Sequence, residues 1–135
     1  MIFCMVKRVA TFLDANFLIA LYSEQDIHHK NAVELSQHLQ HPFTSDDVVD
    51  EAISVTLRKF GKKQAIEILD NITSSLPVFM CDKSAFEAGA IIFHTTPHNF
   101  SFTDCMVLAV LSVTGTHDIA TFDKEFKKTN VTVVD

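Results

Sequence analysis

The sequence has 135 residues, of which 47% are hydrophobic and twelve are Phe, enough apolar material for the core of one domain over residues 1–135. Its 17 Asp and Glu outnumber its 11 Lys and Arg, and the formal charge of −6 argues against a strong stand-alone binder of nucleic acid. This charge does not exclude a nuclease whose acids are gathered in a metal site, and it leaves room for a basic protein partner.

The cysteines and the apolar runs indicate the compartment. Cys4, Cys81 and Cys105 are odd in number and widely spaced, which argues against a disulfide framework or a structural zinc site. No apolar run approaches the roughly 18 residues that a membrane span needs. Lys7 and Arg8 precede only a short apolar stretch, which argues against a cleaved signal peptide. We therefore expect a cytoplasmic protein without membrane contact.

Strand-like and helix-like stretches alternate from the beginning of the chain. The apolar run 9–13 predicts a strand buried on both faces, and it leads through Asp14 into a short apolar helix over 15–22. The elements that follow are a helix over 28–39, a very short strand over 43–45, and a helix over 46–60 with Asp46 as its N-cap and Gly61 at its end.

The second half of the chain continues the alternation. The predicted elements are a helix over 62–72, a strand over 76–80 at a sheet edge because of Pro77, a helix capped by Asp82 or Ser84 that ends before Pro97, a helix over 102–113 stopped at Gly115, a strand over 119–122, a charged turn over 123–128, and a strand over 131–134. This order predicts an α/β fold with three layers, in which helices cover both faces of a central, mainly parallel sheet of about five strands.

Four carboxylates fall near one edge of that sheet. Asp14 and Asp123 follow the first and fourth strands, and Asp104 lies in the first turn of its helix. Glu51 lies about five residues into the helix after the second strand, roughly 7–8 Å from its start. Because strand ends and the starts of the following helices share one edge in βαβ units, we expect these four acids to face a common site.

Each acid also has a simpler interpretation. Asp14 and Asp123 are suited to cap the segments that follow them. Ser101-x-x-Asp104 has the spacing of a capping box, although Val107 and Leu111 place Asp104 on an apolar helix face. Glu51 can face either a cleft or solvent.

The grouping favours a metal site over three separate caps and a solvent-facing Glu51. Two carboxylates ~4 Å apart repel each other by several kcal/mol at an effective dielectric near 20. A cluster of three or four therefore persists only when a divalent cation neutralises it or some members stay protonated. Carboxylate ligands suit Mg²⁺ or Mn²⁺, and such sites perform phosphoryl-ester chemistry by orienting a water and stabilising charge on the phosphate.

The sequence resembles the PIN-domain family, and within it the VapC-type toxin ribonucleases of prokaryotes. The motifs that carry the resemblance are Phe12-Leu13-Asp14-Ala15-Asn16-Phe17-Leu18-Ile19, Asp50-Glu51, Ser101-Phe102-Thr103-Asp104 and Thr121-Phe122-Asp123-Lys124-Glu125-Phe126. Each motif alone is weak, but the set has the family's order and covers essentially the whole chain.

The resemblance implies a catalytic and metal-binding quartet at Asp14, Glu51, Asp104 and Asp123. It gives a supporting role to Thr121, the hydroxyl beside the fourth acid, and to Asn16, the small polar residue after the first. It further implies cleavage of RNA with Mg²⁺ or Mn²⁺, a homodimer, and a cognate antitoxin that blocks the site. Asp47 and Asp50 lie close enough to Glu51 to replace or assist it.

Basic residues near the proposed edge are candidate RNA contacts. They are Arg58, Lys59, Lys62, Lys63, Lys124, Lys127 and Lys128. The simpler interpretation is that they are solvated helix ends, where Lys and Arg are favoured anyway. His28 and His29 are assigned to a helix start, because the carboxylates already supply a complete site for a hard ion.

Three other functions remain open. One is a catalytically silent PIN fold that serves as a binding or scaffold module. Another is a haloacid-dehalogenase-like phosphatase with Asp14 as nucleophile, although that family has a second Asp where this chain has Asn16. The third, a receiver domain, requires a Lys at the end of the last strand, and residues 131–135 contain none.

Overall fold

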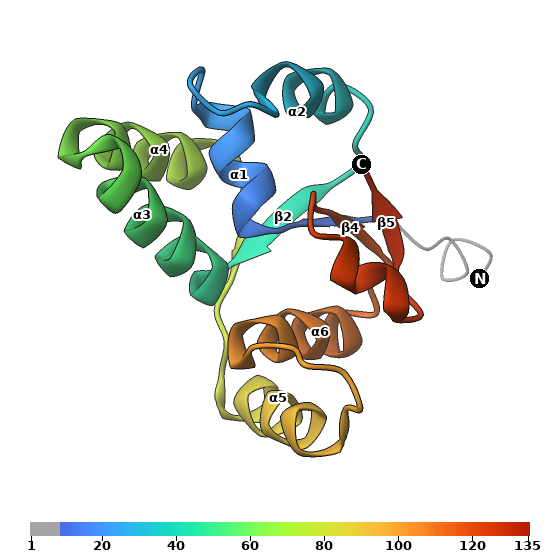
Figure 1. The fold of residues 1–135 in the computed structure, drawn as a ribbon. Helices are drawn as coiled ribbons and strands as arrows, with labels where there is room; N and C mark the ends of the chain where they lie inside the picture. The colour runs from blue at the N-terminus through green and yellow to red at the C-terminus, as the bar shows by residue number, and fades with distance from the viewer. Residues whose placement is uncertain (1–8) are drawn as a thin grey trace, which may run out of the picture.

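The computed structural model of the chain describes residues 9–135, so Cys4, Lys7 and Arg8 lie outside the described residues. Its centre is a five-stranded, fully parallel sheet with the order β3-β2-β1-β4-β5 (Figure 1). The strands are β1 (Thr11–Leu13), β2 (Pro42–Ser45), β3 (Val78–Phe79), β4 (Asp118–Ala120) and β5 (Thr132–Val134). The predicted α/β fold is confirmed, and β3 with its preceding Pro77 lies at an edge as expected.

Helices cover both faces of this sheet. They are α1 (Ala15–Tyr22), α2 (His29–Ser36), α3 (Asp46–Phe60), α4 (Lys62–Ser75), α5 (Lys83–Thr95), α6 (Phe102–Thr114) and the 3₁₀ helix η2 (Lys124–Lys128). Figure 1 shows α1 to α4 on one side of the sheet, and α6 on the other side with α5 outside it. None of these helices is long and apolar enough to cross a membrane.

The core explains why the short strands are stable. Phe12 and Leu13 of β1 and Ile119 of β4 are at most 1% exposed, so these central strands are buried on both faces. Phe17 and Leu18 of α1 are fully buried above them. The apolar run 9–13 is thus the middle of the sheet, as its composition predicts, although the strand itself begins at Thr11.

Several predicted boundaries were wrong by one to three residues. Ser45, not Asp46, is the N-cap of α3, because its hydroxyl accepts from Val48 N while the Asp46 carboxylate accepts from Cys81 N at 2.9 Å. Strand β4 ends at Ala120, so Thr121 and Phe122 belong to the loop after it. Helix α2 ends at Ser36, before the predicted Leu39, and the charged turn is the 3₁₀ helix η2.

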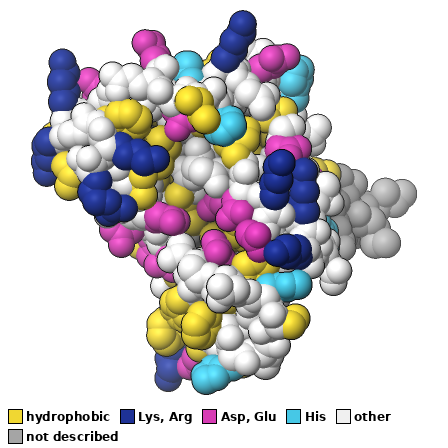
Figure 2. Space-filling view, in the orientation of Figure 1, with side chains coloured by type: hydrophobic (Ala, Val, Ile, Leu, Met, Phe, Trp, Pro, Cys, Tyr) yellow, Lys and Arg dark blue, Asp and Glu magenta, His cyan; other side chains and the backbone are white. Residues whose placement is uncertain are grey.

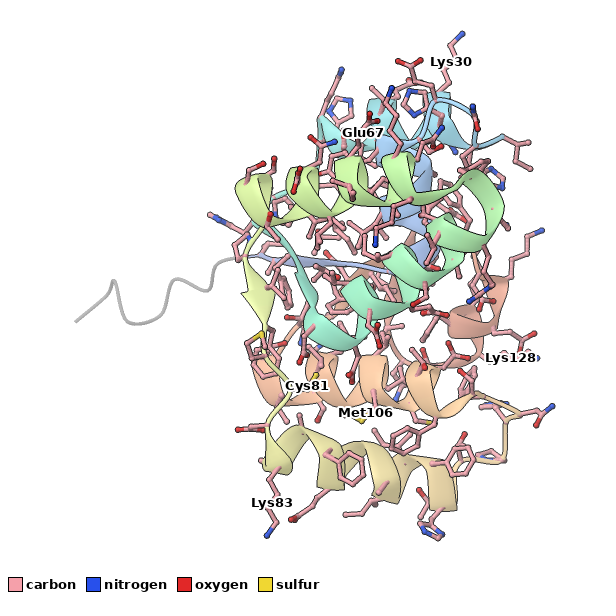
Figure 3. The ribbon with its side chains drawn as sticks, turned by 90° about the vertical axis from the view of Figure 1, so that its left-hand side faces the viewer. Lys30, Glu67, Cys81, Lys83, Met106 and Lys128 are labelled. Carbon is pink, nitrogen blue, oxygen red and sulfur yellow. The ribbon has the colours of Figure 1, made fainter. Side chains whose placement is uncertain are left out.

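Helix α5 lies close against α6. A methyl group added to Gly89 of α5 would come within 2.3 Å of the Met106 sulfur, so this contact requires glycine or a different Met106 rotamer. Figure 3 shows Met106 on α6, on the side that faces α5, and Cys81 on the segment between β3 and α5.

The side on which successive strands are added to the sheet changes at β1, although all the strands stay parallel. Strands β2 and β3 extend to one side of β1, and β4 and β5 extend to the other. Ligands of open parallel sheets bind at the carboxyl ends of the strands beside such a change of side. Asp14 follows β1 at this position, and its backbone N–H donates to Ala120 O at the end of β4.

Candidate functional site

Asp14 connects the sheet to the first helix. It is the N-cap of α1, where its Oδ1 accepts from Ala15 N at 2.8 Å. Its Oδ2 accepts from the Thr121 hydroxyl at 2.8 Å. The residue is 6% exposed, unusually buried for a carboxylate. Asp14 is therefore a cap and also a buried polar group at the sheet edge, so the two interpretations of the sequence are not exclusive.

Asn16 and Thr121 hold Asp14 in place. Asn16 Nδ2 donates to Thr121 Oγ1 at 3.0 Å, and Asn16 Oδ1 accepts from Phe122 N at 2.9 Å. Thr121 Oγ1 also accepts from Asp123 N at 3.0 Å. One small network thus joins the beginning of α1 to the loop after β4, and it orients the Asp14 carboxylate.

Asp104 and Asp123 are caps as well. Asp104 Oδ2 accepts from Ser101 N at 3.2 Å, and Asp104 N donates to the Ser101 hydroxyl at 3.1 Å, which completes a capping box at the start of α6. Asp123 caps η2 through Glu125 N at 2.9 Å. Capping fixes the positions of both carboxylates, because the Asp104 carboxylate accepts from the backbone of Ser101 and the Asp123 carboxylate accepts from the backbone of Glu125.

The four predicted acids line one pocket. Its volume is about 190 Å³, and its walls are Asp14, Ala15, Asn16, Ile19, Asp26, Glu51, Val55, Lys59, Asp104 and Asp123. Glu51 and Val55 come from one face of α3, as their spacing requires. On the face of the molecule shown in Figure 2, Asp and Glu side chains gather near the middle, between α3 and η2. Asp26, in the loop between α1 and α2, is the one acid of this pocket that sequence reasoning missed.

The electrostatics of the pocket show excess negative charge. Burial raises the pKa of Asp14 from 3.8 to about 6, against the hydrogen bonds from Thr121 and Ala15, and the charges of Glu51 and Asp104 raise it further. The pKa of Glu51 is also raised, by partial burial and then by Asp104 and Asp123. These carboxylates therefore oppose one another's ionisation across the pocket.

Asp47 and Asp50 belong to a different surface. They line a neighbouring groove between α3 and the α5–α6 pair, and Glu51 is the acid that lines both the groove and the pocket. This placement favours Glu51 over Asp47 and Asp50 as the partner of Asp14.

A tighter group of possible metal ligands lies outside the pocket. Asp46, Asp47 and Cys81 offer ligand atoms within 4.8 Å of one another, the one such group found among residues 9–135. Burial and the two carboxylates raise the pKa of the Cys81 thiol to about 12, which keeps it protonated. The Asp46 carboxylate is already bound to Cys81 N, and both acids lie in the first turn of α3, so this group has a structural explanation. The four acids of the pocket are spread more widely.

The candidate RNA contacts lie on both sides of the acids. Lys59 lines the pocket itself, and Arg58, Lys62 and Lys63 share its end of α3 and α4. The other set, Lys124, Lys127 and Lys128, belongs to η2. Figure 2 shows Lys and Arg side chains flanking the acidic centre on the α3–α4 side and on the η2 side. Two of the η2 lysines form surface ion pairs, Lys127 with Asp135 and Lys128 with Glu125.

The chain belongs to the PIN-domain family, since the PIN domain model matches residues 11–131. This assignment agrees with the motifs found in the sequence, and it replaces the phosphatase and receiver alternatives. No curated protein matches the sequence closely enough to count as a relative.

Solved structures of similar fold include proteins of toxin–antitoxin systems. The VapC20 toxin of Mycobacterium tuberculosis, described as cleaving the sarcin–ricin loop, superposes with a TM-score of 0.81 at 22% identity, over 87% of this chain and 93% of that one. VapBC2 of Rickettsia felis, bound to a DNA fragment from its promoter, superposes with a TM-score of 0.71 at 14% identity, over 93% of this chain and 98% of that one. FitAcB of Neisseria gonorrhoeae superposes with a TM-score of 0.71 at 17% identity, over 93% of this chain and 96% of that one. At these identities the comparison establishes the fold.

Proposed function

We propose that this PIN-domain protein is a divalent-metal-dependent endoribonuclease and the toxin of a toxin–antitoxin pair. The observation that carries the proposal is the convergence of Asp14, Glu51, Asp104 and Asp123, from four separate elements, on one pocket of about 190 Å³. Asp14, Asp104 and Asp123 are helix caps that the topology brings to one edge of the sheet. Glu51 lies inside α3 and caps no helix, yet it lines the same pocket, as a carboxylate site for a hard cation requires.

The pocket has the chemistry of a Mg²⁺ or Mn²⁺ site. Its donors are carboxylate oxygens, which these ions prefer. Burial is the main cause of the raised pKa of Asp14, and the charges of Glu51 and Asp104 raise it further, so a divalent cation at this site would neutralise carboxylates that repel one another. The residues that would hold it are Asp14, Glu51, Asp104 and Asp123. When bound, such an ion supplies charge stabilisation for the phosphate and orientation for the attacking water.

Other residues of the site would orient the Asp14 carboxylate and bind the phosphates of the substrate. Thr121 and Asn16 fix the direction of the Asp14 carboxylate through the hydrogen bonds described above. Lys59, on the pocket wall, is placed to neutralise a phosphate of the substrate. The basic side chains on both sides of the acids suit a strand of RNA that crosses the pocket with its backbone held on each flank.

An exposed aromatic cluster supports a protein partner. Phe86 and Phe93 of α5 and Phe102 at the start of α6 are 56%, 49% and 38% exposed. Phe102 makes edge-to-face contacts with both other rings, at 5.7 and 5.8 Å between ring centroids. An apolar surface of this kind suits burial against another protein. A solved structure of similar fold from Klebsiella pneumoniae is a toxin–antitoxin complex. We infer a homodimer and a cognate antitoxin, both in the cytoplasm with the RNA.

Metal-dependent cleavage by matched variants tests the proposal. The parent, incubated with structured RNA, should cleave in Mg²⁺ or Mn²⁺ and not in chelator. Asp14→Asn and Asp104→Asn should lose at least about 100-fold in single-turnover rate while remaining folded by circular dichroism. Glu51→Gln should follow them, whereas Asp50→Asn, one residue away in the neighbouring groove, should retain the parental rate. A folded parent with neither Mn²⁺ uptake nor cleavage would instead identify a silent binding module.

A further inference from the structure

The last residue of the loop between α1 and α2 is His28, whose imidazole forms no hydrogen bond with the described residues. His28 occupies the N-cap position of α2, yet its side chain makes no capping bond, and no described residue hydrogen-bonds to its imidazole. The residue is exposed. The assignment of His28 to a helix start is correct in position, but it does not explain the side chain.

The imidazole instead forms the outer member of a stack of three rings. It lies over Phe122 with 4.3 Å between ring centroids and an interplanar angle of 12°. Phe122 in turn stacks on Phe17 at 5.7 Å and 21°, and Phe17 is fully buried in the core. The stack therefore leads from the core to the surface and ends in a ring whose inner face is covered by Phe122.

This stack lies at the edge of the acidic pocket. Phe122 stands between Thr121 and Asp123, and its backbone N–H is held by Asn16 of the pocket wall. His28 N donates at 2.8 Å to the carboxylate of Asp26, another wall residue. Both ends of the ring pair are thus anchored to residues that line the pocket.

A stacking surface at this place answers a physical need of the substrate. The pocket is lined by five acids and the chain has a net charge of −6, so the affinity that the flanking Lys and Arg side chains give to the phosphates benefits from a further, uncharged contact. Stacking of a base on an aromatic ring does not depend on the charge of the backbone, and it tolerates any base. Single-stranded RNA is commonly gripped in this way on Phe, Tyr, Trp or His.

We propose that His28, supported by Phe122, stacks against a nucleobase next to the phosphate held in the acidic pocket. This inference rests on the ribonuclease activity proposed above, and it assigns His28 as a substrate-binding residue. Because a ring stack reads the flat face of a base and not its edge, it positions RNA without selecting a sequence.

RNA binding with and without bases tests the stack. In an Asp104→Asn background, which blocks cleavage, the affinity for a fluorescent 12-nucleotide single-stranded RNA of randomised sequence is measured in Mg²⁺. The same is done for a ribose–phosphate 12-mer without bases. His28→Ala should weaken the first by about fivefold or more and leave the second within about twofold. His28→Phe, which keeps a flat ring, should bind both as the background protein does.

The controls separate this inference from the proposed function. His38→Ala removes another exposed histidine, one that lies at the opposite edge of the sheet near Thr11, and should change neither affinity. Equal losses for both oligomers with His28→Ala would mean that the ring acts on phosphate, which overturns the stacking proposal. If His28→Ala binds the RNA 12-mer as tightly as the background protein and the parent cleaves RNA with metal, the stacking proposal is overturned and the proposed function stands. A background protein that binds neither oligomer, with a parent that does not cleave, overturns both.

Discussion

Replacing Asp14 with Asn should stabilise the metal-free protein at neutral pH. The carboxyl is 6% exposed, and its pKa is raised from 3.8 to about 6 by burial and, more weakly, by neighbouring acids. At about 1.4 kcal/mol per pKa unit, ionised Asp14 destabilises the fold by roughly 3 kcal/mol above pH 7. The amide loses one of two good hydrogen-bond acceptors, at a cost of about 1 kcal/mol. The net gain of about 2 kcal/mol corresponds to roughly 7 °C in Tm for 135 residues.

The destabilisation by Asp14 should depend on pH, because the carboxyl must be ionised to destabilise the fold. The folded carboxyl binds its proton more tightly than the unfolded one, because its folded pKa is the higher of the two. The destabilisation is therefore absent below pH 3.8, develops between pH 3.8 and 6, and is complete above pH 6. The advantage of Asp14→Asn should accordingly fall to near zero at pH 4.5.

Thermal unfolding in chelator at pH 4.5 and 7.5 measures the effect. Asp82→Asn is the matched control, because Asp82 is an exposed N-cap of α5 and Asn caps as well as Asp, so its Tm should change little at either pH. Adding Mn²⁺ should then raise the Tm of the parent more than that of Asp14→Asn. A difference between parent and Asp14→Asn that is the same at both pH values would refute the reasoning from burial and charge.

Two further substitutions test the supports of the site and the fold. Thr121→Val should cost about 1–3 kcal/mol in urea unfolding and reduce cleavage, because it leaves buried partners of the hydroxyl unpaired, and Thr121→Ser should restore both. Gly61→Ala should cost about 1–3 kcal/mol, since Gly61 has φ 92° and ψ 175°, a conformation nearly restricted to glycine. An unfolding midpoint equal to that of the parent would show that the α3–α4 junction relaxes without strain.

Much of the fold follows from patterns that are local in the sequence. The alternation of short apolar runs with amphipathic segments is enough to predict a parallel sheet, and Gly61 marks the end of α3 correctly. Boundaries depend on tertiary partners and so were less accurate. Thr121 and Phe122 have strand-like side chains, yet the Phe122 N–H is bound by the Asn16 side chain, so the strand ends before them.

The candidate site was predictable where residues sit at the ends of elements. Asp14, Asp104 and Asp123 each follow a strand or open a helix, so topology alone brings them to one edge. Asp26 and the ring of His28 belong to the loop between α1 and α2, which has no periodic pattern. Their position beside the pocket depends on how this loop folds back over Phe122, which no local rule specifies.

The strand order, in which β2 and β3 lie on one side of β1 and β4 and β5 on the other, also determines how the pocket would be divided if the chain were cut. A cut between β3 and α5, near Asp82, would place Asp14 and Glu51 on one fragment and Asp104 and Asp123 on the other. Neither piece would contain a whole pocket, and β1 would lose the neighbour β4 that its buried edge requires. The two halves are suited to a split-protein complementation experiment, because a whole pocket forms only when both are brought together.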